Sequence, residues 1–315
     1  MNLIFCGTPQ FAVPTLEKLV ASAFPVSLVL TNPDEPRGRG YRLKASPVKE
    51  SAAKAGLRIL QPKNLKDPAV EVEIRSLKPD AIVVVAYGHL IPAWMIEVPR
   101  FGWINLHASL LPRYRGAAPI PWAIIRGERA TGVTTMQIDR GLDTGDILLQ
   151  RATEISNEDT TETLSERLSV IGAELMAETL GKIERNEIKP QPQDERIATR
   201  APMLTKDDGR IDWRLTAEEI SRRVRGLRPW PVAHTAFRGR NLQIWSARLL
   251  ASTPASALAP GELSACQGAL IAGCGGGTQI EIMELQLEGR KRMPARDFIN
   301  GVRLLSDERL EEGKT

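Results

Sequence analysis

The sequence predicts an α/β fold: a Rossmann-like N-terminal domain with a parallel sheet, and a smaller C-terminal OB-like β-barrel domain. Over the first half of the chain, apolar strand-like runs alternate with amphipathic helix-like stretches, which is typical of a parallel sheet flanked by helices. A proline-rich polar stretch follows, and after it come short β-like pieces separated by glycine and proline. A length of 315 residues suits one large and one smaller domain.

The predicted first domain covers residues 1–187. It begins with a strand at 2–6, a turn at GTP and an amphipathic helix at 11–23. A second strand is expected at 25–31. The run Ile-Val-Val-Val within 78–88 is typical of a central strand that helices cover on both faces.

The rest of this domain leads to the motif of interest. WINLH at 103–107 is a shorter alternating strand, followed by a helix at 119–127 and a returning strand at 132–138. A helix at 160–185 closes the domain, because its large aliphatic residues recur at i, i+3 and i+4. Ligands of such folds bind at the carboxyl ends of the strands, where the stretch NLHASLLPRYRG at 105–116 lies.

A polar linker is expected at 188–206, because this stretch is proline-rich and has no hydrophobic periodicity. The second domain then covers 207–315 and starts with a helix at 216–227. Short strand-like pieces follow at 241–250, 268–274 and 278–287. Glycine and proline separate them, which favours a small barrel of OB type.

Composition excludes several classes of protein. Hydrophobic residues make up 42% and charged residues 25% of the chain, and no apolar run approaches the roughly 20 residues that span a bilayer. The start MNLIFCGTPQF reads as a strand and not as a signal peptide, so a cytoplasmic protein without a membrane partner is expected. GTPQF has a single glycine, which argues against a dinucleotide or P-loop enzyme. Three scattered cysteines predict no disulfide framework and no metal site.

Asn105 and His107 are the first candidate catalytic residues. Side chains i and i+2 of a strand point the same way, so an amide and an imidazolium could converge on one carbonyl oxygen. Such a pair would stabilise the oxyanion of an acyl transfer. To act as a donor, the imidazole needs a carboxylate beside it, and Asp143 or Asp146 in GLDTGD could supply one after the strand at 132–138.

Taken singly, each of these residues also has an ordinary structural interpretation. Asn105 could cap a turn, His107 could be a semi-buried histidine with satisfied hydrogen bonds, and Asp143 could close an Asx-turn. Physical reasoning from the residues alone leaves acyl transfer as one interpretation among these.

A family resemblance adds to this reasoning. The run from Asn105 through SLLPRYRGAAPI, with GLDTGD about thirty residues later, resembles the signature of the folate-dependent formyltransferases. The opening FCGTPQFAVPTLEKL, the loop TNPDEPRGRGYRLKASPVK and the stretch IDWRLTAEEISRRVRGLRPWP resemble the branch of that family that acts on transfer RNA. The resemblance extends nearly from end to end.

The resemblance implies a reaction and a role for each candidate. The formyl donor would be 10-formyltetrahydrofolate, and the acceptor would be the α-amino group of initiator methionyl-tRNA. The family's Asn, His and Asp match Asn105, His107 and Asp143. Asn105 and His107 would hold the developing oxyanion, while Asp143 would keep His107 protonated and help to relay the amine proton through water.

The resemblance also implies where the folate binds. The loop after the 103–107 strand and the end of the 78–88 strand would line the pterin pocket, with backbone groups bonding the ring and apolar side chains covering it. By sequence alone, SLLP could equally be a plain strand-to-helix turn. The implied folate-binding residues are Ser109, Leu110, Leu111, Pro112, Val85, Tyr87 and Gly88.

Two basic regions are candidates for binding transfer RNA. The Gly- and Pro-rich loop carries Arg37, Arg39, Arg42 and Lys44. By composition this is most often a solvated mobile loop, but the resemblance implies that it enters the acceptor end of the transfer RNA. Arg39 matches the family's functional arginine, and a guanidinium can both pair with phosphate and stack on an unpaired base.

The second basic region lies in the C-terminal domain. The helix at 216–227 carries Arg222, Arg223 and Arg225, and Lys291 lies in the cluster EGRKRMP. A solvated helix face is the ordinary interpretation. Beside a barrel of OB type these residues would instead position the RNA by its phosphates, without reading its sequence.

Three functions remain open from the sequence. The leading one is an enzyme, expected as a monomer, that formylates methionyl-tRNA. The same site could serve a small acceptor such as an amino sugar, or water in a hydrolase, but then the basic regions would have no use. An RNA-binding protein without catalysis would have no need of Asn105, His107 and Asp143.

Overall fold

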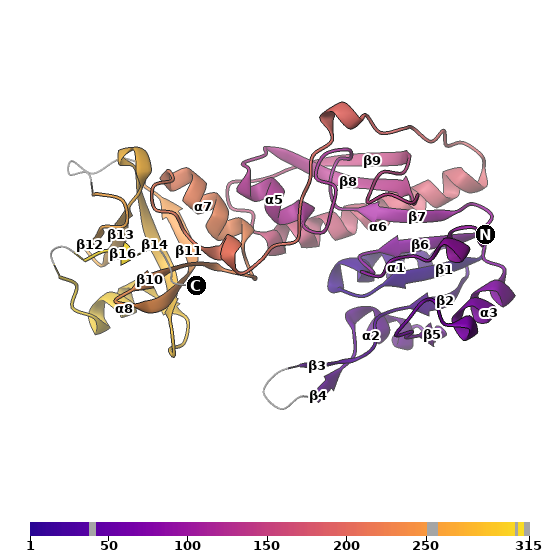
Figure 1. Cartoon of the computed structure of the whole chain (residues 1–315), viewed down its shortest axis with the longest axis horizontal. Coiled ribbons are helices and arrows are strands. Elements are labelled where there is room, and N and C mark those ends of the chain that lie inside the picture. Colours follow the sequence, from indigo (N-terminus) through magenta and orange to yellow (C-terminus); the bar gives the residue numbers. More distant parts are fainter. Residues whose placement is uncertain (38–41, 251–257, 306–307, 312–315) are drawn as a thin grey trace. The chain divides into compact units, whose positions relative to one another are not determined.

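The computed structural model describes residues 1–37, 42–250, 258–305 and 308–311, with only the backbone described at 36, 37 and 42. It divides into two compact units that interleave along the chain (Figure 1). The first contains Met1–Pro119, Ala130–Glu154 and Ser165–Ala201, and the second contains Ile120–Arg129, Ile155–Leu164 and Pro202–Thr315. The boundaries expected at 187 and 206 stay predictions.

The first unit is built on a seven-stranded sheet of order β5-β2-β1-β6-β7-β8-β9. Its strands are β1 Leu3–Gly7, β2 Val26–Leu30, β5 Ile59–Leu60, β6 Ala81–Val85, β7 Trp103–His107, β8 Ala130–Gln137 and β9 Ile147–Glu154. From β5 to β7 all neighbours pair in parallel, which confirms the predicted Rossmann-like fold. β8 pairs antiparallel with β7, and β9 pairs antiparallel with β8. The strand predicted at 132–138 therefore runs opposite to β7.

Helices accompany this sheet as predicted, with additional ones at 47–54, 68–77 and 93–96. Their bounds are α1 Val13–Val20, α2 Pro47–Lys54, α3 Pro68–Leu77, α4 Ala93–Ile96, α5 Pro119–Ile125 and α6 Thr161–Glu184. The short helix η1 covers Gln10–Ala12. Ser46 caps α2 and Asp67 caps α3, each followed by proline at the first helical position, which is the usual start of a helix.

Packing on the two faces of β7 decides which face is available for function. On one face Leu106 lies against Gly172 of α6, and Thr135 of β8 bonds Thr179 of α6 at 2.8 Å. The opposite face carries Trp103, Asn105 and His107, because alternate residues share a side. Trp103 is buried there with Met95. The polar residues therefore follow a buried core along the strand to its carboxyl end.

The second unit contains an antiparallel sheet of order β12-β13-β14-β11-β10-β16, and β15 pairs with β14. Its strands are β10 Ala233–Phe237, β11 Arg240–Leu249, β12 Leu263–Cys266, β13 Ala269–Gly273, β14 Gln279–Leu287, β15 Met293–Pro294 and β16 Leu310–Glu311. The two edges meet, because Leu263 N bonds Glu308 O at 2.8 Å and Leu310 N bonds Gly261 O at 2.7 Å. The sheet is therefore curled, as a barrel-like domain requires, and its OB type stays a prediction.

Two helices belong to this sheet. α7 covers Ala217–Gly226 and packs on β11, and α8 covers Ala295–Gly301 and packs on β13 and β14. Thr216 and Glu219 form a capping box at the start of α7, the arrangement that satisfies two of the free amides of a first turn. Short helices η2 Glu195–Ile197, η3 Asp207–Gly209 and η4 Gly275–Gly277 complete the described fold, and β3 Glu35–Arg37 pairs with β4 Arg42–Lys44.

Candidate active site

Asn105 and His107 lie on β7 as predicted, and the structure buries them to different degrees. His107 is only 6% exposed, while Asn105 is half-buried. Within the described residues no hydrogen bond to the Asn105 side chain is found, although an amide offers two donors and an acceptor. The amide of Asn105 is therefore free to bind a group from outside the protein.

His107 uses its two ring nitrogens differently. Nε2 lies 2.9 Å from the carbonyl oxygen of Tyr114, and Nδ1 lies 3.7 Å from Oδ2 of Asp143. A carbonyl can only accept, so Nε2 must carry a proton. In neutral His107 the other nitrogen, Nδ1, is then bare, and it becomes a donor only when the ring is protonated. The Asp143 carboxylate lies on the Nδ1 side of the ring, where it can pair with that cationic form.

Asp143 is held in position by backbone groups. Gly116 N donates to its Oδ2 at 2.8 Å, and the Asp143 side chain is 14% exposed. The residue has a φ of 55°, a left-handed conformation that a non-glycine residue adopts at a cost. Gly145 closes the same loop, because a Cβ at this position would lie 1.8 Å from Gln137 O. A glycine is thus required at this position of the loop.

The loop that contains Ser109, Leu110, Leu111 and Pro112 is tied to strand β8. Thr134 Oγ1 donates to Ser109 O at 2.6 Å and accepts from Leu111 N at 3.1 Å, and Ser109 Oγ donates to Arg113 O at 2.6 Å. Leu110 remains half-buried, while Ser109, Leu111 and Pro112 are buried. SLLP is thus a fixed turn beside His107, and its contact with folate stays a prediction.

The end of β6 offers backbone, and not side chains, to a ligand. Val85 is fully buried and Tyr87 is 2% exposed, so both side chains belong to the core. Burial raises the pKa of the Tyr87 hydroxyl, which finds no hydrogen-bond partner within the described residues. Ala86 and Gly88 are exposed, and Gly88 has a φ of 80°. The predicted contact of this edge with a pterin ring stays a prediction.

The first basic region is described only in part. Arg39 lies outside the described residues, and Arg37 and Arg42 are described only by their backbone in β3 and β4. Lys44 at the end of β4 is exposed. The predicted role of this region in RNA binding stays a prediction.

The arginines of α7 are bonded within the second unit. Arg222 pairs with Glu218 at 2.8 Å, Arg223 donates to Asp208 O at 2.7 Å, and Arg225 donates to Asp159 O at 2.7 Å. Burial lowers the pKa of the Arg225 guanidinium. The predicted solvated or RNA-facing row of charges is thus a set of half-buried groups with internal partners.

Lys291 has a different setting from these arginines. It lies in the turn between β14 and β15, its side chain is exposed, and no ion pair to it is found in the described part of the chain. Its neighbour Arg292 bonds Glu284 and lies 4.8 Å from the Trp245 ring. Of the basic residues predicted in this unit, Lys291 is the one whose charge faces solvent without an internal partner.

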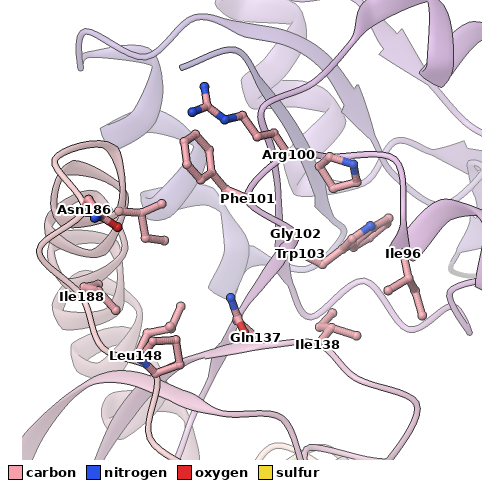
Figure 2. Close-up of a pocket in the computed structure, with 13 residues that line it drawn as sticks. Ile96, Arg100, Phe101, Gly102, Trp103, Gln137, Ile138, Leu148, Asn186 and Ile188 are labelled. Carbon is pink, nitrogen blue, oxygen red and sulfur yellow. The ribbon is translucent and has the colours of Figure 1, made fainter.

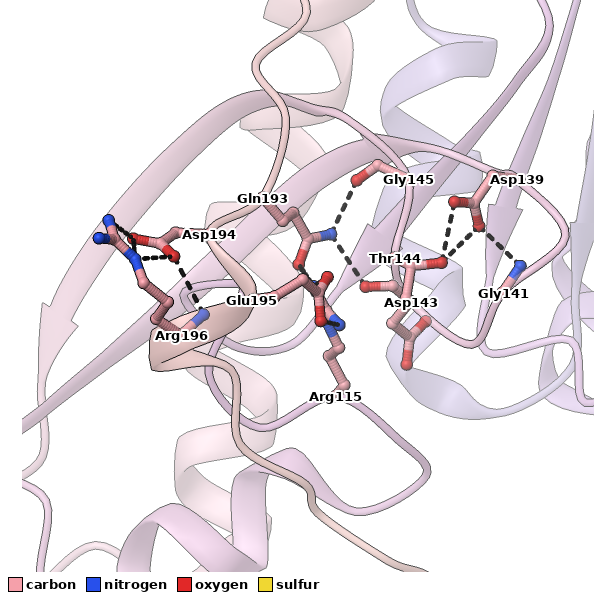
Figure 3. A network of polar contacts seen from close by, with 10 residues as sticks. All are labelled: Arg115, Asp139, Gly141, Asp143, Thr144, Gly145, Gln193, Asp194, Glu195 and Arg196. Carbon is pink, nitrogen blue, oxygen red and sulfur yellow. Dashed lines mark hydrogen bonds and ion pairs between the residues drawn. The ribbon is translucent and has the colours of Figure 1, made fainter.

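Two polar residues that the sequence analysis did not single out complete the site. Arg115, the second arginine of the RYRG stretch, is 9% exposed. It bonds Gln193 and Glu195 (Figure 3). Gln193 lies in the stretch expected to be a free linker, yet it bonds the backbone of Asp143 and Gly145. The sequence signals were weak: an arginine inside the motif and a glutamine that follows Pro192.

A cavity of about 480 Å³ lies at the other end of β7 (Figure 2). Trp103, the first residue of the strand, lines it, whereas His107 is the last residue of the strand. Most of the other lining residues are apolar by type, with Phe101, Ile138 and Leu148 among them, and Arg100 is the one charged residue in the lining. The residues that could carry out acyl transfer do not line it.

Among the described residues, no group of three or more His, Cys, Asp and Glu side chains could hold a metal ion. Within the same residues no helix is long and apolar enough to cross a membrane.

Comparison with known proteins gives consistent results for both parts of the chain. Residues 1–180 match the family model described as formyl transferase, and residues 203–303 match that of the formyl transferase C-terminal domain. The methionyl-tRNA formyltransferase of Koribacter versatilis is 52% identical over 311 residues, which cover 98% of both chains. That of Acidobacterium capsulatum is 50% identical over 311 residues, covering 98% of this chain and 99% of the relative.

Solved structures agree on the fold. An N-formyltransferase from Helicobacter canadensis, in complex with folinic acid and dTDP-3-aminofucose, aligns with a TM-score of 0.69 at 19% identity over 89% of this chain and 98% of its own. A methionyl-tRNA formyltransferase from Clostridium thermocellum aligns with a TM-score of 0.56 at 18% identity over 79% and 94%. At such low identity these likenesses concern the fold alone.

Proposed function

Because the chain belongs to the methionyl-tRNA formyltransferase family, we propose that it transfers the formyl group of 10-formyltetrahydrofolate to the α-amino group of initiator methionyl-tRNA. The observation that supports the chemistry best is the approach of Asp143 Oδ2 to within 3.7 Å of His107 Nδ1, while Nε2 is bonded to Tyr114 O. This arrangement gives the imidazolium one proton to offer at the end of β7.

The proposed reaction is a direct acyl transfer. The amine nitrogen attacks the formyl carbon, a new C–N bond forms, and the bond from that carbon to N10 of the folate breaks. The formyl oxygen carries negative charge in between, and it accepts hydrogen bonds from the Asn105 amide and from the protonated Nδ1 of His107. One amine proton passes through water to N10, so tetrahydrofolate leaves as a neutral amine.

Asp143 has two parts in this proposal. Its carboxylate stabilises the imidazolium of His107, which would otherwise be costly to hold in a site where it is 6% exposed. It also accepts the amine proton on the way to the leaving group through a water molecule. Gly116 N fixes the carboxylate for both tasks by its 2.8 Å hydrogen bond.

We place the folate against the turn Ser109–Pro112 and the exposed backbone at Ala86 and Gly88. The hydrogen bonds of Thr134 hold that turn in one conformation before a ligand arrives, which lowers the entropic cost of binding. Val85 and Tyr87 support this edge from inside the core. The chain is proposed to act as a cytoplasmic monomer.

For the transfer RNA we propose contacts from the 37–44 loop and from Lys291. Lys44 and Lys291 are exposed cations, and the net charge of the chain is +4, so long-range attraction of a polyanion is favoured. Arg39 would recognise the acceptor end. The α7 arginines contribute less directly, because their guanidinium groups already have partners.

One assay tests donor, acceptor and selectivity together. The full-length protein is incubated with 10-formyltetrahydrofolate and methionine esterified to either initiator or elongator transfer RNA, and the products are separated. Formylmethionine on the initiator alone is the expected result. Release of formate in the absence of an acceptor, or formylation of an amino sugar in preference to the aminoacyl-tRNA, would contradict the proposal.

A further inference from the structure

The segment 190–201 runs past both loops of the candidate active site, and we call it the strap. At its start, Gln191 and Ile147 exchange two backbone hydrogen bonds of 2.8 and 2.9 Å beyond the Asp143 loop. At its end, Arg115 N bonds Thr199 O at 2.9 Å and Ala201 N bonds Arg115 O at 2.7 Å. Backbone pairing thus fixes the strap on either side of its middle.

In the middle of the strap, both the nitrogen and the oxygen of the Gln193 side-chain amide form hydrogen bonds with these loops (Figure 3). Its Nε2 donates to Asp143 O at 2.9 Å and to Gly145 O at 2.7 Å. Its Oε1 accepts from Arg115 Nε at 3.0 Å and from Arg115 Nη2 at 2.8 Å. Both donors and the acceptor are used, so the side chain has one orientation.

Arg115 extends this network to the other side of Asp143. Its guanidinium forms a two-pronged pair with Glu195 of the strap, at 3.0 and 2.7 Å, the strongest geometry for an arginine and a carboxylate. The next residue, Gly116, donates its N–H to Asp143 Oδ2. Gln193 therefore holds the backbone of Asp143, and Gly116 holds its carboxylate. Arg115 supports both, because it bonds Gln193 and directly precedes Gly116.

Asp143 needs such support because of its backbone. A φ of 55° is left-handed, and residues in that conformation persist only where the surroundings determine it. In this loop the two carbonyl oxygens that Gln193 binds flank the turn at Thr144. Loss of both bonds would free the loop to relax and move the carboxylate away from His107.

We propose that Gln193 is a positioning residue that aims the Asp143 carboxylate at His107, and that the strap is part of the active site. The inference rests on the proposed function, since it assumes that Asp143 acts in the transfer step. Gln193 touches neither substrate in this account. Its effect should therefore fall on turnover, and binding of the folate and the transfer RNA should be preserved.

The test compares Gln193→Met with Gln191→Met in the full-length protein. Both remove an amide from the strap, but the Gln191 side chain is exposed and, among the described residues, bonded through its backbone alone. We expect Gln193→Met to lower kcat by roughly 10- to 100-fold at nearly constant KM, as small misplacements of a catalytic group do. Gln191→Met should keep the parent kcat. Equal kcat values in the two variants overturn the inference.

A second variant guards against simple misfolding. Gln193→Glu keeps an acceptor for Arg115 but has no N–H for the two carbonyl groups. The fold should therefore be preserved while the Asp143 carboxylate is no longer held toward His107. Its kcat should fall as in Gln193→Met, with a circular dichroism spectrum like that of the parent. A Gln193→Glu enzyme of full turnover overturns the proposed role of the two donors.

Double substitution separates this inference from the proposed function. If Gln193 works through Asp143, adding Gln193→Met to Asp143→Ala should lower kcat little further, because residues that act as one unit are not additive. A full additional loss overturns the positioning role. Should Asp143→Ala itself keep parent turnover, the proposed mechanism fails too, whereas an impaired Asp143→Ala beside a fully active Gln193→Met overturns the positioning alone.

Discussion

The carboxyl end of β7 and the helix α7 are both rich in polar side chains, and they use them in opposite ways. At β7 the Asn105 amide has no described partner, and His107 and Asp143 stand 3.7 Å apart. On α7 the three arginines are each bonded inside the second unit. The unbonded amide of Asn105 makes the first region the candidate site for chemistry, and the internal partners of the α7 arginines favour a role in stability for the second.

This difference shows that a charged residue in a sequence does not by itself predict a side chain that is available to bind a partner. An arginine on an amphipathic helix looks solvated, but its long side chain can reach a distant carbonyl and lose its availability. An asparagine on a buried strand looks like a structural cap, but the Asn105 side chain forms no hydrogen bond within the described residues. Partners, more than residue type, separate the two regions.

The largest expected effect would establish the β7 side of the comparison. Asn105→Ala and Asp143→Ala should each lower kcat by roughly 100-fold or more, since removing one oxyanion donor commonly does so. Steady-state formylation of methionyl-tRNA measures this. Asp146→Ala is the matched control from the same loop, because no hydrogen bond or ion pair of the Asp146 side chain is found in the described part of the chain, and it should retain turnover. Parent-like activity in Asn105→Ala would break the comparison.

The next effect concerns α7. Arg225→Met should lower the free energy of unfolding by about 1–3 kcal/mol, because it leaves the carbonyl of Asp159 with one hydrogen bond fewer from a charged, half-buried donor. Urea unfolding measures the change, and Arg290→Met, at an exposed turn position, is the control. Unchanged stability together with weaker RNA binding would return α7 to the RNA-facing role.

A smaller effect distinguishes a solvent-facing cation from a bonded one. Lys291→Glu should weaken transfer RNA binding and reduce the slope of log Kd against log salt by about one unit, as the loss of one phosphate contact does. Titrations at several salt concentrations measure the slope. Arg222→Gln is the comparison, and because Glu218 already neutralises Arg222, its slope should stay close to that of the parent. The reverse ranking would contradict our placement of the RNA.

The smallest effect is a pH dependence of stability. Hydrogen bonds from Arg238 lower the pKa of Glu308, and those from Arg115 lower the pKa of Glu195. A lowered carboxyl pKa stabilises the fold above the ordinary glutamate range, and the stabilisation is lost as pH falls through the lowered value. Glu308 is 8% exposed and the Glu195 side chain 71%, so Glu308 should contribute more.

Thermal unfolding between neutral and acidic pH tests this ranking. The difference in melting temperature between the parent and Glu308→Gln should be largest near neutral pH and should disappear in acid. For Glu195→Gln this difference in melting temperature should be smaller at every pH. A difference that grows in acid would contradict the predicted direction of the pKa effect.

The candidate site could be predicted in part from the sequence: strand alternation puts Asn105 and His107 on one face, GLDTGD offers Asp143 or Asp146 as the carboxylate, and the family resemblance selects Asp143. Asn105 and His107 are two residues apart, and the glycines around Asp143 mark a sharp loop. Long-range hydrogen bonds leave no such trace: Gln193 is 50 residues from Asp143 and 78 from Arg115. Periodicity reports packing faces, so a single amide that bridges two loops escapes it.

The same reason explains the other differences. The direction of β8 depends on the path between it and β7, and hydrophobic alternation is the same for a parallel and an antiparallel strand. The partners of Arg223 and Arg225 are backbone carbonyls far along the chain, and any residue type could supply them. Sequence patterns therefore predict which elements form more reliably than what their polar tips contact.

The strap gives the chain an order of completion. Asn105, His107 and Asp143 leave the ribosome well before Gln193. A nascent polypeptide that has emerged only as far as residue 187 therefore holds every proposed catalytic group without the amide that we propose positions Asp143. A fragment cut at that point for crystallisation or engineering would share this defect. The first unit is therefore complete only when residues 190–201 have emerged, after the strands and helices that they secure.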